Sequence, residues 1–129
     1  MGSKKQSSGR ISVKVKPSYS SEQSQPENDR YVFSYDVKIK NSSDKTVKLM
    51  YRHWVITDTN GRKREIQGEG VVGGQPSLEP GEEFEYTSWT ILETPNGHMQ
   101  GHYHMEYEGG KKFETAIPAF SLTTPTTLH

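Results

Sequence analysis

The sequence predicts an all-β fold, an antiparallel β-sandwich or barrel of about seven to eight short strands. Apolar residues recur at every second position along most of the chain, which is the period of a strand with one wet face. Turn-forming pairs such as Asn60-Gly61 and Gly109-Gly110 separate these stretches. No window of ten residues has the 3.6-residue period of an amphipathic helix.

The expected strands follow one another along the chain. Residues 31–40 have the clearest pattern, with apolar residues at every odd position and polar residues at most even ones. A one-residue shift of the pattern near Arg52-His53 indicates a β-bulge, and Pro118 is expected to kink the last strand or to place it at an edge. Residues 17–30 are expected to form a loop. The alternation predicts strands at residues 11–16, 31–40, 47–56, 63–67, 84–91, 98–107 and from 113 onward.

The composition is typical of one soluble domain without disulfides. The chain has 129 residues, no cysteine, and 16 basic and 16 acidic residues, so its formal net charge is zero. A zero charge gives no general attraction to nucleic acid, which is therefore not an expected partner. No apolar run approaches the ~20 residues of a membrane-spanning helix, so we expect no membrane insertion.

The N-terminal segment differs from the rest of the chain. Residues 1–9 are expected to be a disordered tail or an expression scar, and residues 10–129 to form the domain. Five basic residues and no acidic one lie within residues 1–16, which is typical of a solvated segment. The tail lacks the apolar stretch of a signal peptide, so the cytoplasm is the expected location.

Several short motifs, taken together, resemble those of the ApaG family. They include Gly68-Glu69-Gly70-Val71-Val72-Gly73, Tyr86-Thr87-Ser88, Glu93-Thr94-Pro95 and Met99-Gln100-Gly101-His102-Tyr103. The resemblance covers roughly residues 10–129. It implies an immunoglobulin- or fibronectin type III-like antiparallel β-sandwich. It also implies a link, by name, to cobalt resistance and magnesium efflux, and a partner-binding role like that of related domains in eukaryotic F-box proteins.

The glycine-rich segment 68–74 is a candidate anion site. Its Gly-x-Gly-x-x-Gly spacing matches a dinucleotide fingerprint, but prolines and another strand follow it, so the helix of a Rossmann-type site is not expected. Its backbone N–H groups can still form a nest for phosphate or pyrophosphate. Alternatively, the glycines permit only a tight, bulged crossing between sheets. The candidate anion-binding residues are Gly68, Glu69, Gly70, Gly73, Gly74 and Arg64.

A group of histidines is a candidate metal site. His102 and His104 alternate along one strand, so their side chains lie ~7 Å apart along its axis and can converge on one divalent ion. Glu106, or His53 from a neighbouring strand, is expected to supply a further ligand. The alternative is that these residues form an ordinary solvated polar face. No cofactor is expected beyond a weakly bound divalent metal at His102, His104 and Glu106.

Nothing in the sequence predicts catalysis. There is no cysteine nucleophile, and Ser88 lacks the glycines of a nucleophile elbow. The glutamates around the Pro80-Gly81 turn are expected to be solvated, and no acid–base pair is evident. Both tryptophans, Trp54 and Trp89, are expected in the core.

The leading prediction is a non-catalytic binding module that engages a protein partner, with a cellular role in divalent-cation (Co²⁺/Mg²⁺) homeostasis. A homodimer through sheet edges is also plausible, because such sandwiches expose edge strands. The alternative is a small-ligand binder that holds phosphate or pyrophosphate at Gly68–Gly74 or a divalent metal at His102 and His104. A hydrolase of phosphoanhydrides is a third hypothesis.

Overall fold

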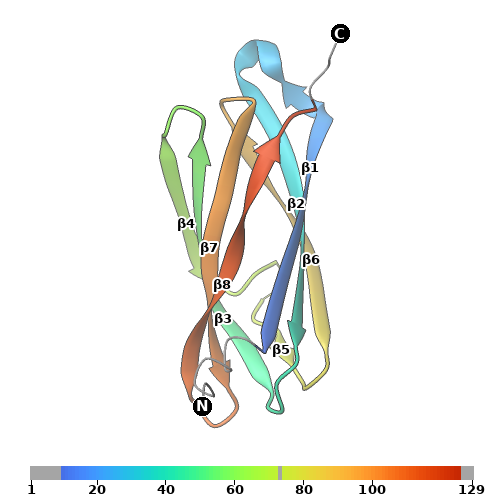
Figure 1. The fold of residues 1–129 in the computed structure, drawn as a ribbon, viewed down its shortest axis with the longest axis vertical. Helices are drawn as coiled ribbons and strands as arrows, with labels where there is room; N and C mark the ends of the chain where they lie inside the picture. Colours follow the sequence, from blue (N-terminus) through green and yellow to red (C-terminus); the bar gives the residue numbers. More distant parts are fainter. Residues whose placement is uncertain (1–9, 73, 126–129) are drawn as a thin grey trace.

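The computed structural model of the chain describes residues 10–72 and 74–125. These residues form two antiparallel sheets packed face to face (Figure 1). The all-β fold predicted from the period-2 pattern, and the β-sandwich implied by the family resemblance, are therefore confirmed. The tail expected at residues 1–9 lies outside the described residues. No helix in the described part of the chain is long and apolar enough to cross a membrane.

The two sheets differ in size. The smaller sheet has three strands in the order β1-β2-β6, and the larger has the order β4-β3-β7-β8 with the short β5 also paired to β3. A 3₁₀ turn, η2, joins β1 to β2. The bounds are β1 (Ile11–Gln25), η2 (Pro26–Asn28), β2 (Arg30–Asn41), β3 (Val47–Asp58), β4 (Lys63–Glu69), β5 (Ser77–Leu78), β6 (Glu83–Leu92), β7 (Asn96–Tyr107) and β8 (Lys112–Thr123).

The first strand is longer than the sequence predicts. The expected loop at residues 17–30 is wrong, because β1 continues to Gln25 and stays paired with β2 through Ser20. Tyr19 holds this part of β1 in place, since its ring packs 5.3 Å from the ring of Phe33. Pro17 is tolerated because β1 is an edge strand of its sheet. The apolar period fades here because much of this edge segment is exposed on both faces.

Two irregularities in the larger sheet set which side chains face the core. Leu49 pairs with Met105 and Tyr51 with His104, so Met50 is an extra residue that forms a bulge in β3. The sequence places this bulge slightly later in the strand, where the shifted pattern becomes visible. A second register shift lies between β7 and β8, next to Pro118. Strand β8 is an edge strand of its sheet, as expected for a strand that contains this proline.

The core lies between the sheets and is rich in aromatic side chains. Trp54 is buried at its centre, with ring centroids 5.3 Å from Tyr35, 5.9 Å from Phe120 and 6.4 Å from Tyr103. Such edge-to-face contacts add to the stabilisation from burial. The expectation for the other tryptophan is wrong, because Trp89 lies on the outer face of β6 and is 52% exposed.

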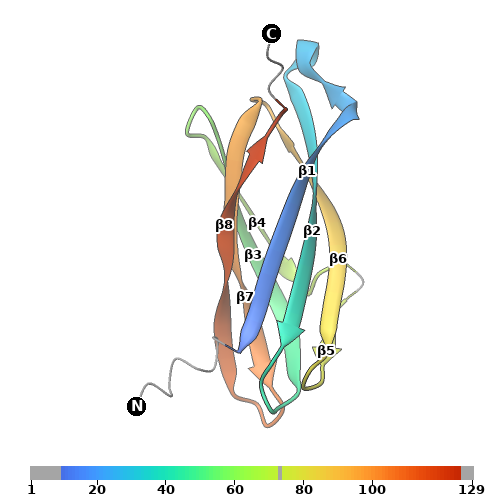
Figure 2. The same cartoon turned by 45° about the vertical axis from the view of Figure 1, so that its right-hand side comes forward.

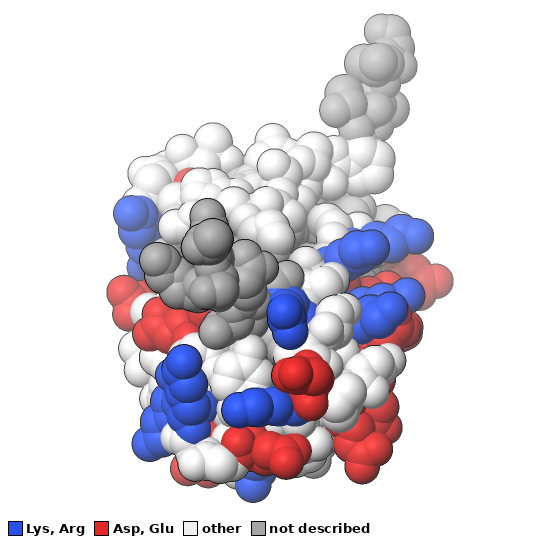
Figure 3. All heavy atoms as spheres, turned by 60° about the horizontal axis from the view of Figure 1, so that its bottom comes forward, with Lys and Arg blue, Asp and Glu red and all other residues white. Residues whose placement is uncertain are grey.

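The two sides of the sandwich are closed differently. Strands β1 and β8 contact each other along one side. On the other side, the connection from β4 to β5 lies against β6 (Figure 2). The surface charges are mixed, as Figure 3 illustrates for one end of the molecule, where basic and acidic side chains are interspersed. This fits the zero formal charge.

Candidate functional site

A histidine cluster lies on the outer face of the larger sheet. His53 on β3 lies opposite His102 on β7, and His104 on β7 lies opposite Glu114 on β8. His102 and His104 point to the same face because alternate residues of a strand do so. The three neighbouring strands therefore bring four possible ligands to one surface, at a half-buried position for the histidines.

The distances within the cluster suit a metal ion. The Nε2 atoms of His102 and His104 are 3.2 Å apart. Two nitrogens bound to one Zn²⁺ at 2.0–2.1 Å in tetrahedral geometry are about 3.3–3.4 Å apart. Glu114 Oε2 lies 4.0 Å from His102 Nε2 and 3.5 Å from His104 Nδ1. One ligand atom from each of the three residues lies within 4.8 Å of the others.

The position of Glu114 allows two roles. Its carboxylate can move toward the two Nε2 atoms and complete a three-ligand set. It can instead accept a hydrogen bond from His104 Nδ1, which leaves the Nε2 lone pair of that ring free for a metal. In both arrangements the negative charge of Glu114 favours a cation between the histidines.

Neighbouring side chains hold the imidazole rings in place. The His53 ring packs edge-on against His102, with centroids 5.0 Å apart, and its Nε2 lies 3.3 Å from Glu65 Oε1. The Tyr51 ring packs edge-on against His104 at 5.6 Å. These contacts restrict the rotamers of the two central histidines, which reduces the entropy lost on binding an ion.

The predicted ligand Glu106 lies outside this three-residue group. It pairs with Lys48 on β3 and with Lys112 on β8, so two lysines flank it in the sheet. The carboxylate of the cluster comes instead from Glu114, which lies ten residues after His104 on the next strand. The Gly109-Gly110 turn indicates that β8 returns beside β7, but the sequence does not fix the register that places Glu114 opposite His104.

Three backbone N–H groups of the glycine-rich segment, the candidate anion nest, are hydrogen-bonded within the chain. The backbone N–H groups of Gly70, Val71 and Gly74 donate to the carbonyl oxygens of Met50, Gly74 and Val71, at 2.9, 2.9 and 3.0 Å. These donors are therefore occupied by the chain itself. Gly73 lies outside the described residues.

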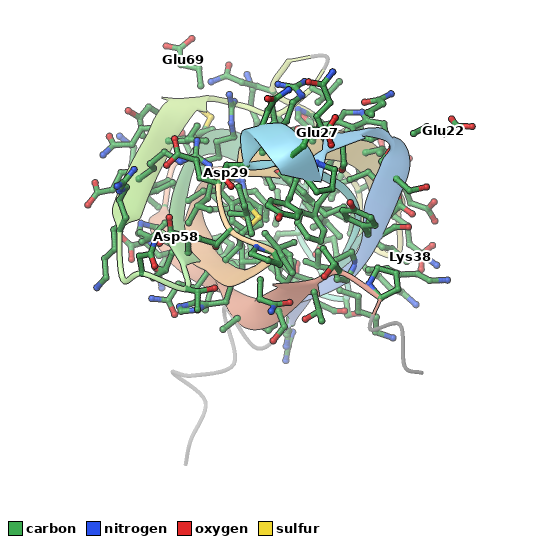
Figure 4. All side chains as sticks on the ribbon, turned by 90° about the horizontal axis from the view of Figure 1, so that it is seen from above. Glu22, Glu27, Asp29, Lys38, Asp58 and Glu69 are labelled. Carbon is green, nitrogen blue, oxygen red and sulfur yellow. The ribbon has the colours of Figure 1, made fainter. Side chains whose placement is uncertain are left out.

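The other candidates for the anion site point elsewhere. Glu69 projects away from the sandwich (Figure 4), and its carboxylate would repel an anion. Arg64 donates from Nη2 to the carbonyl oxygen of Ile91 on β6, at 2.6 Å, so it bridges the two sheets. Gly70 has a φ of +64°, and an added Cβ would collide with the carbonyl oxygen of Gly74. This geometry matches the alternative, a tight crossing that requires glycine.

Arg52 is a half-buried cation on the inner face of β3 that the sequence analysis did not identify as a candidate site residue. Its Nη1 donates to the carbonyl oxygens of Glu69 and Gly70, at 3.2 and 3.0 Å. Its guanidinium packs over Gly68, where a Cβ would lie 3.0 Å from Nη2. The available signal was the β3 phase shift, which gives Arg52 the same inward parity as Trp54.

Two tyrosine hydroxyls lie close to Arg52 in the core. The hydroxyl oxygens of Tyr86 and Tyr103 are 2.6 Å apart, in a buried hydrogen bond. Burial raises the pKa of Tyr86 to about 12, and it raises the pKa of Tyr103 as well. Both side chains are therefore neutral near pH 7, and their hydrogen bond stabilises the fold.

Comparisons with known proteins give a consistent result. A family model described as the ApaG domain matches residues 21–107. Protein ApaG from Rhodopseudomonas palustris (strain TIE-1) is 57% identical over 116 residues, which cover 90% of this chain and 89% of that protein. Protein ApaG from Escherichia coli O1:K1 / APEC is 52% identical over 122 residues, covering 95% and 98%.

Solved structures agree with the fold. A crystal structure of a Bordetella pertussis protein has a TM-score of 0.88 and 48% identity, covering 91% of this chain and 95% of that one. A protein from Archaeoglobus fulgidus has a TM-score of 0.53 at 12% identity, covering 90% and 100%. The second likeness concerns the fold alone.

Proposed function

We propose, since the chain belongs to the ApaG domain family, that it is a non-catalytic binding module that holds a divalent transition-metal ion at His102, His104 and Glu114. The observation that carries the proposal is the 3.2 Å separation of the two Nε2 atoms with a carboxylate oxygen 4.0 Å from one of them. The cellular role that follows is a contribution to divalent-cation homeostasis in the cytoplasm.

The ligand chemistry selects among cations. Imidazole nitrogen suits Co²⁺, Ni²⁺ and Zn²⁺, whereas Mg²⁺ prefers oxygen ligands in octahedral geometry and keeps several waters. The proposed order of affinity therefore places Co²⁺ and Zn²⁺ well above Mg²⁺. The site lies on the surface, so water completes the coordination and binding is reversible.

Thermal unfolding in the presence of metal tests the proposal. An ion at 100 times its Kd stabilises the fold by about 2.7 kcal/mol. We expect a saturable rise in Tm with Co²⁺ or Zn²⁺ that is lost in the double variant His102→Ala/His104→Ala. His98→Ala is the matched control, because His98 is an exposed histidine on the same strand. An equal response of the double variant and wild type would refute the site.

The pH provides a second arm of the same experiment. A metal-bound histidine must be neutral, so protonation competes with the ion. The Tm rise with Zn²⁺ should shrink or disappear when the pH falls from 7.5 to 5, because protons then compete with the ion for the imidazole nitrogens. A metal response that persists unchanged at pH 5 would place the ion on carboxylates elsewhere.

A second candidate function is binding of a protein partner, and the distribution of exposed apolar side chains favours it. Within the described chain, the exposed large apolar residues come from β4, from β6 and from the connection between β4 and β5. Their exposed fractions are 37% for Ile66, 57% for Val72, 52% for Trp89 and 40% for Ile91. Apolar side chains gathered on one side of a domain are typical of an interaction surface.

Self-association is the simplest form of that function. Strand β6 is an edge of its sheet and can pair with a second copy. Sedimentation velocity across a concentration series measures this directly. A dimer that Trp89→Ser dissociates would support edge pairing at β6, and a monomer at all concentrations would leave a different protein as the partner.

A further inference from the structure

A small cavity opens on the side of the sandwich between β3 and β6, with Arg52 in its wall. Its volume is about 120 Å³. This is a small space, of a size that admits a few waters or a carboxylate side chain. The residues that line it are Tyr35, Arg52, Trp54, Val71, Val72, Tyr86 and Ser88.

The cavity is chemically suited to an anion. The side chain of Arg52 forms no ion pair with a carboxylate in the described part of the chain, and Nη1 is held by two carbonyl oxygens. Three neutral hydroxyl groups, those of Tyr35, Tyr86 and Ser88, also line the cavity, and that of Tyr86 is hydrogen-bonded to Tyr103. A half-buried guanidinium without a counter-ion gains most from a carboxylate, which can accept two parallel hydrogen bonds.

The rim of the cavity is apolar at Val72 and adjoins the edge of β6, where Arg64 already occupies the carbonyl oxygen of Ile91. Val72, which lines the cavity, is more than half exposed, and Trp89 is more than half exposed on the opposite, outer face of β6. The carbonyl oxygen of Ile91 points away from β2, since it accepts from Arg64 on the other sheet. In an antiparallel strand, alternate residues direct their backbone groups to the same side, so those of Thr87 and Trp89 also face this free edge. A free edge accepts an added strand by main-chain hydrogen bonding.

We propose that this side of the domain binds an extended, acidic segment of a partner protein. The backbone of the segment adds to the β6 edge beside Thr87 and Trp89, and an Asp or Glu side chain enters the cavity to pair with Arg52. Apolar neighbours on the two faces of the added strand pack on Val72 on the cavity side and on Trp89 on the outer face. The inference rests on the protein-binding function proposed above and is independent of the metal site. Charge complementarity identifies the occupant, because the cavity places a cation behind an apolar rim.

The probe for this proposal is a phage-displayed library of random linear 12-residue peptides, selected on the full chain. We expect enriched peptides to contain an acidic residue flanked by apolar residues at alternate positions. Binding of a synthetic enriched peptide is then measured by isothermal titration calorimetry. Arg52→Gln should weaken it about tenfold or more, and Lys38→Gln, on the exposed face of β2, is the matched control.

A double-mutant cycle isolates the contact. Replacing the acidic residue of the peptide by its amide should cost wild type the same affinity that Arg52→Gln costs, and combining both changes should cost no more. Arg52→Gln can also disturb the β4–β5 connection, because Arg52 donates to the carbonyl oxygens of Glu69 and Gly70. Trp89→Ser therefore provides a second variant. Trp89 is 52% exposed and lies outside the core, so this change should lower Tm only modestly, leave the β4–β5 connection in place and still weaken binding.

Each outcome is decisive. Peptides that lose affinity in Trp89→Ser but carry no acidic residue would overturn the carboxylate inference and leave the protein-binding function standing. Losses that simply add in the cycle would overturn it as well. A library from which nothing is enriched would remove both the inference and this binding surface. Perturbation of the β6 backbone amides at residues 87–91 by the acidic peptide would place the segment at the predicted edge.

Discussion

Replacing Gly70 by alanine separates the two interpretations of the glycine-rich segment. Gly70 adopts a φ of +64°, in the left-handed region, and its amide is hydrogen-bonded to Met50. An added Cβ would collide with the carbonyl oxygen of Gly74. The β4–β5 connection around Gly70 must therefore shift, and the hydrogen bonds that hold it in place must lengthen or break.

The size of the effect follows from these contacts. An alanine in the left-handed region costs about 1–2 kcal/mol. Weakening the Gly70–Met50 and Val71–Gly74 hydrogen bonds adds about 1 kcal/mol each. We expect Gly70→Ala to lower the free energy of unfolding by roughly 3–4 kcal/mol, which corresponds to a fall in Tm of roughly 10 °C for a domain of this length.

Gly61→Ala is the matched control, because Gly61 has a φ of +82° and open space around the added Cβ. It should cost only the backbone term, about 1–2 kcal/mol. Urea unfolding of the two variants, with and without pyrophosphate, is the assay. Equal losses would show that the crossing is not sterically tight. Pyrophosphate stabilisation that is present in wild type and absent in Gly70→Ala would revive the anion nest.

Three further predictions concern the core. Tyr86→Phe and Tyr103→Phe should each destabilise the fold by about 1–3 kcal/mol, because each leaves the other buried hydroxyl unpaired, and the double variant should cost less than the sum of the two in urea unfolding. Stability should fall as the pH rises from about 10 toward 12, because Tyr86 loses its proton near pH 10 when unfolded but keeps it to a pKa of about 12 when folded. Tyr86 alone contributes up to about 1.4 kcal/mol per pH unit, and Tyr103, whose pKa is also raised by burial, adds to the slope; urea unfolding of Tyr86→Phe should show a smaller slope than wild type. Asn41→Ala should lower the unfolding free energy by about 3 kcal/mol in thermal denaturation, because the buried amide donates to the carbonyl oxygens of Lys45 and Leu78, which lose their partner.

The strand pattern could be predicted from local sequence because one face of each strand is buried. It failed at residues 17–30, where β1 runs along an edge and much of it is exposed on both faces. It also failed for Trp89, although the outward orientation of that side chain could have been predicted. Trp89 has the opposite parity to Phe84 and Tyr86, which face inward, so the alternation of β6 already turns it outward.

The candidate sites depend on which strands are neighbours, and this limits what the sequence predicts. The shared face of His102 and His104 follows from their spacing on one strand. The proximity of Glu114 depends on the pairing of β7 with β8, and the flanking of Glu106 by lysines depends on the same register. Arg52 reaches the inter-sheet cavity because a single bulge at Met50 reverses the parity of β3.

The proposed metal site is tested most directly by long-range ¹H–¹⁵N correlation of the histidine rings during titration with Zn²⁺. The ring nitrogens of His102 and His104 should shift saturably up to one equivalent of metal, with Nε2 as the coordinating atom of His102, while those of His98 stay in place. Ring nitrogens of His102 and His104 that do not respond to Zn²⁺, or that respond no more than those of His98, would contradict a divalent-cation site on this sheet.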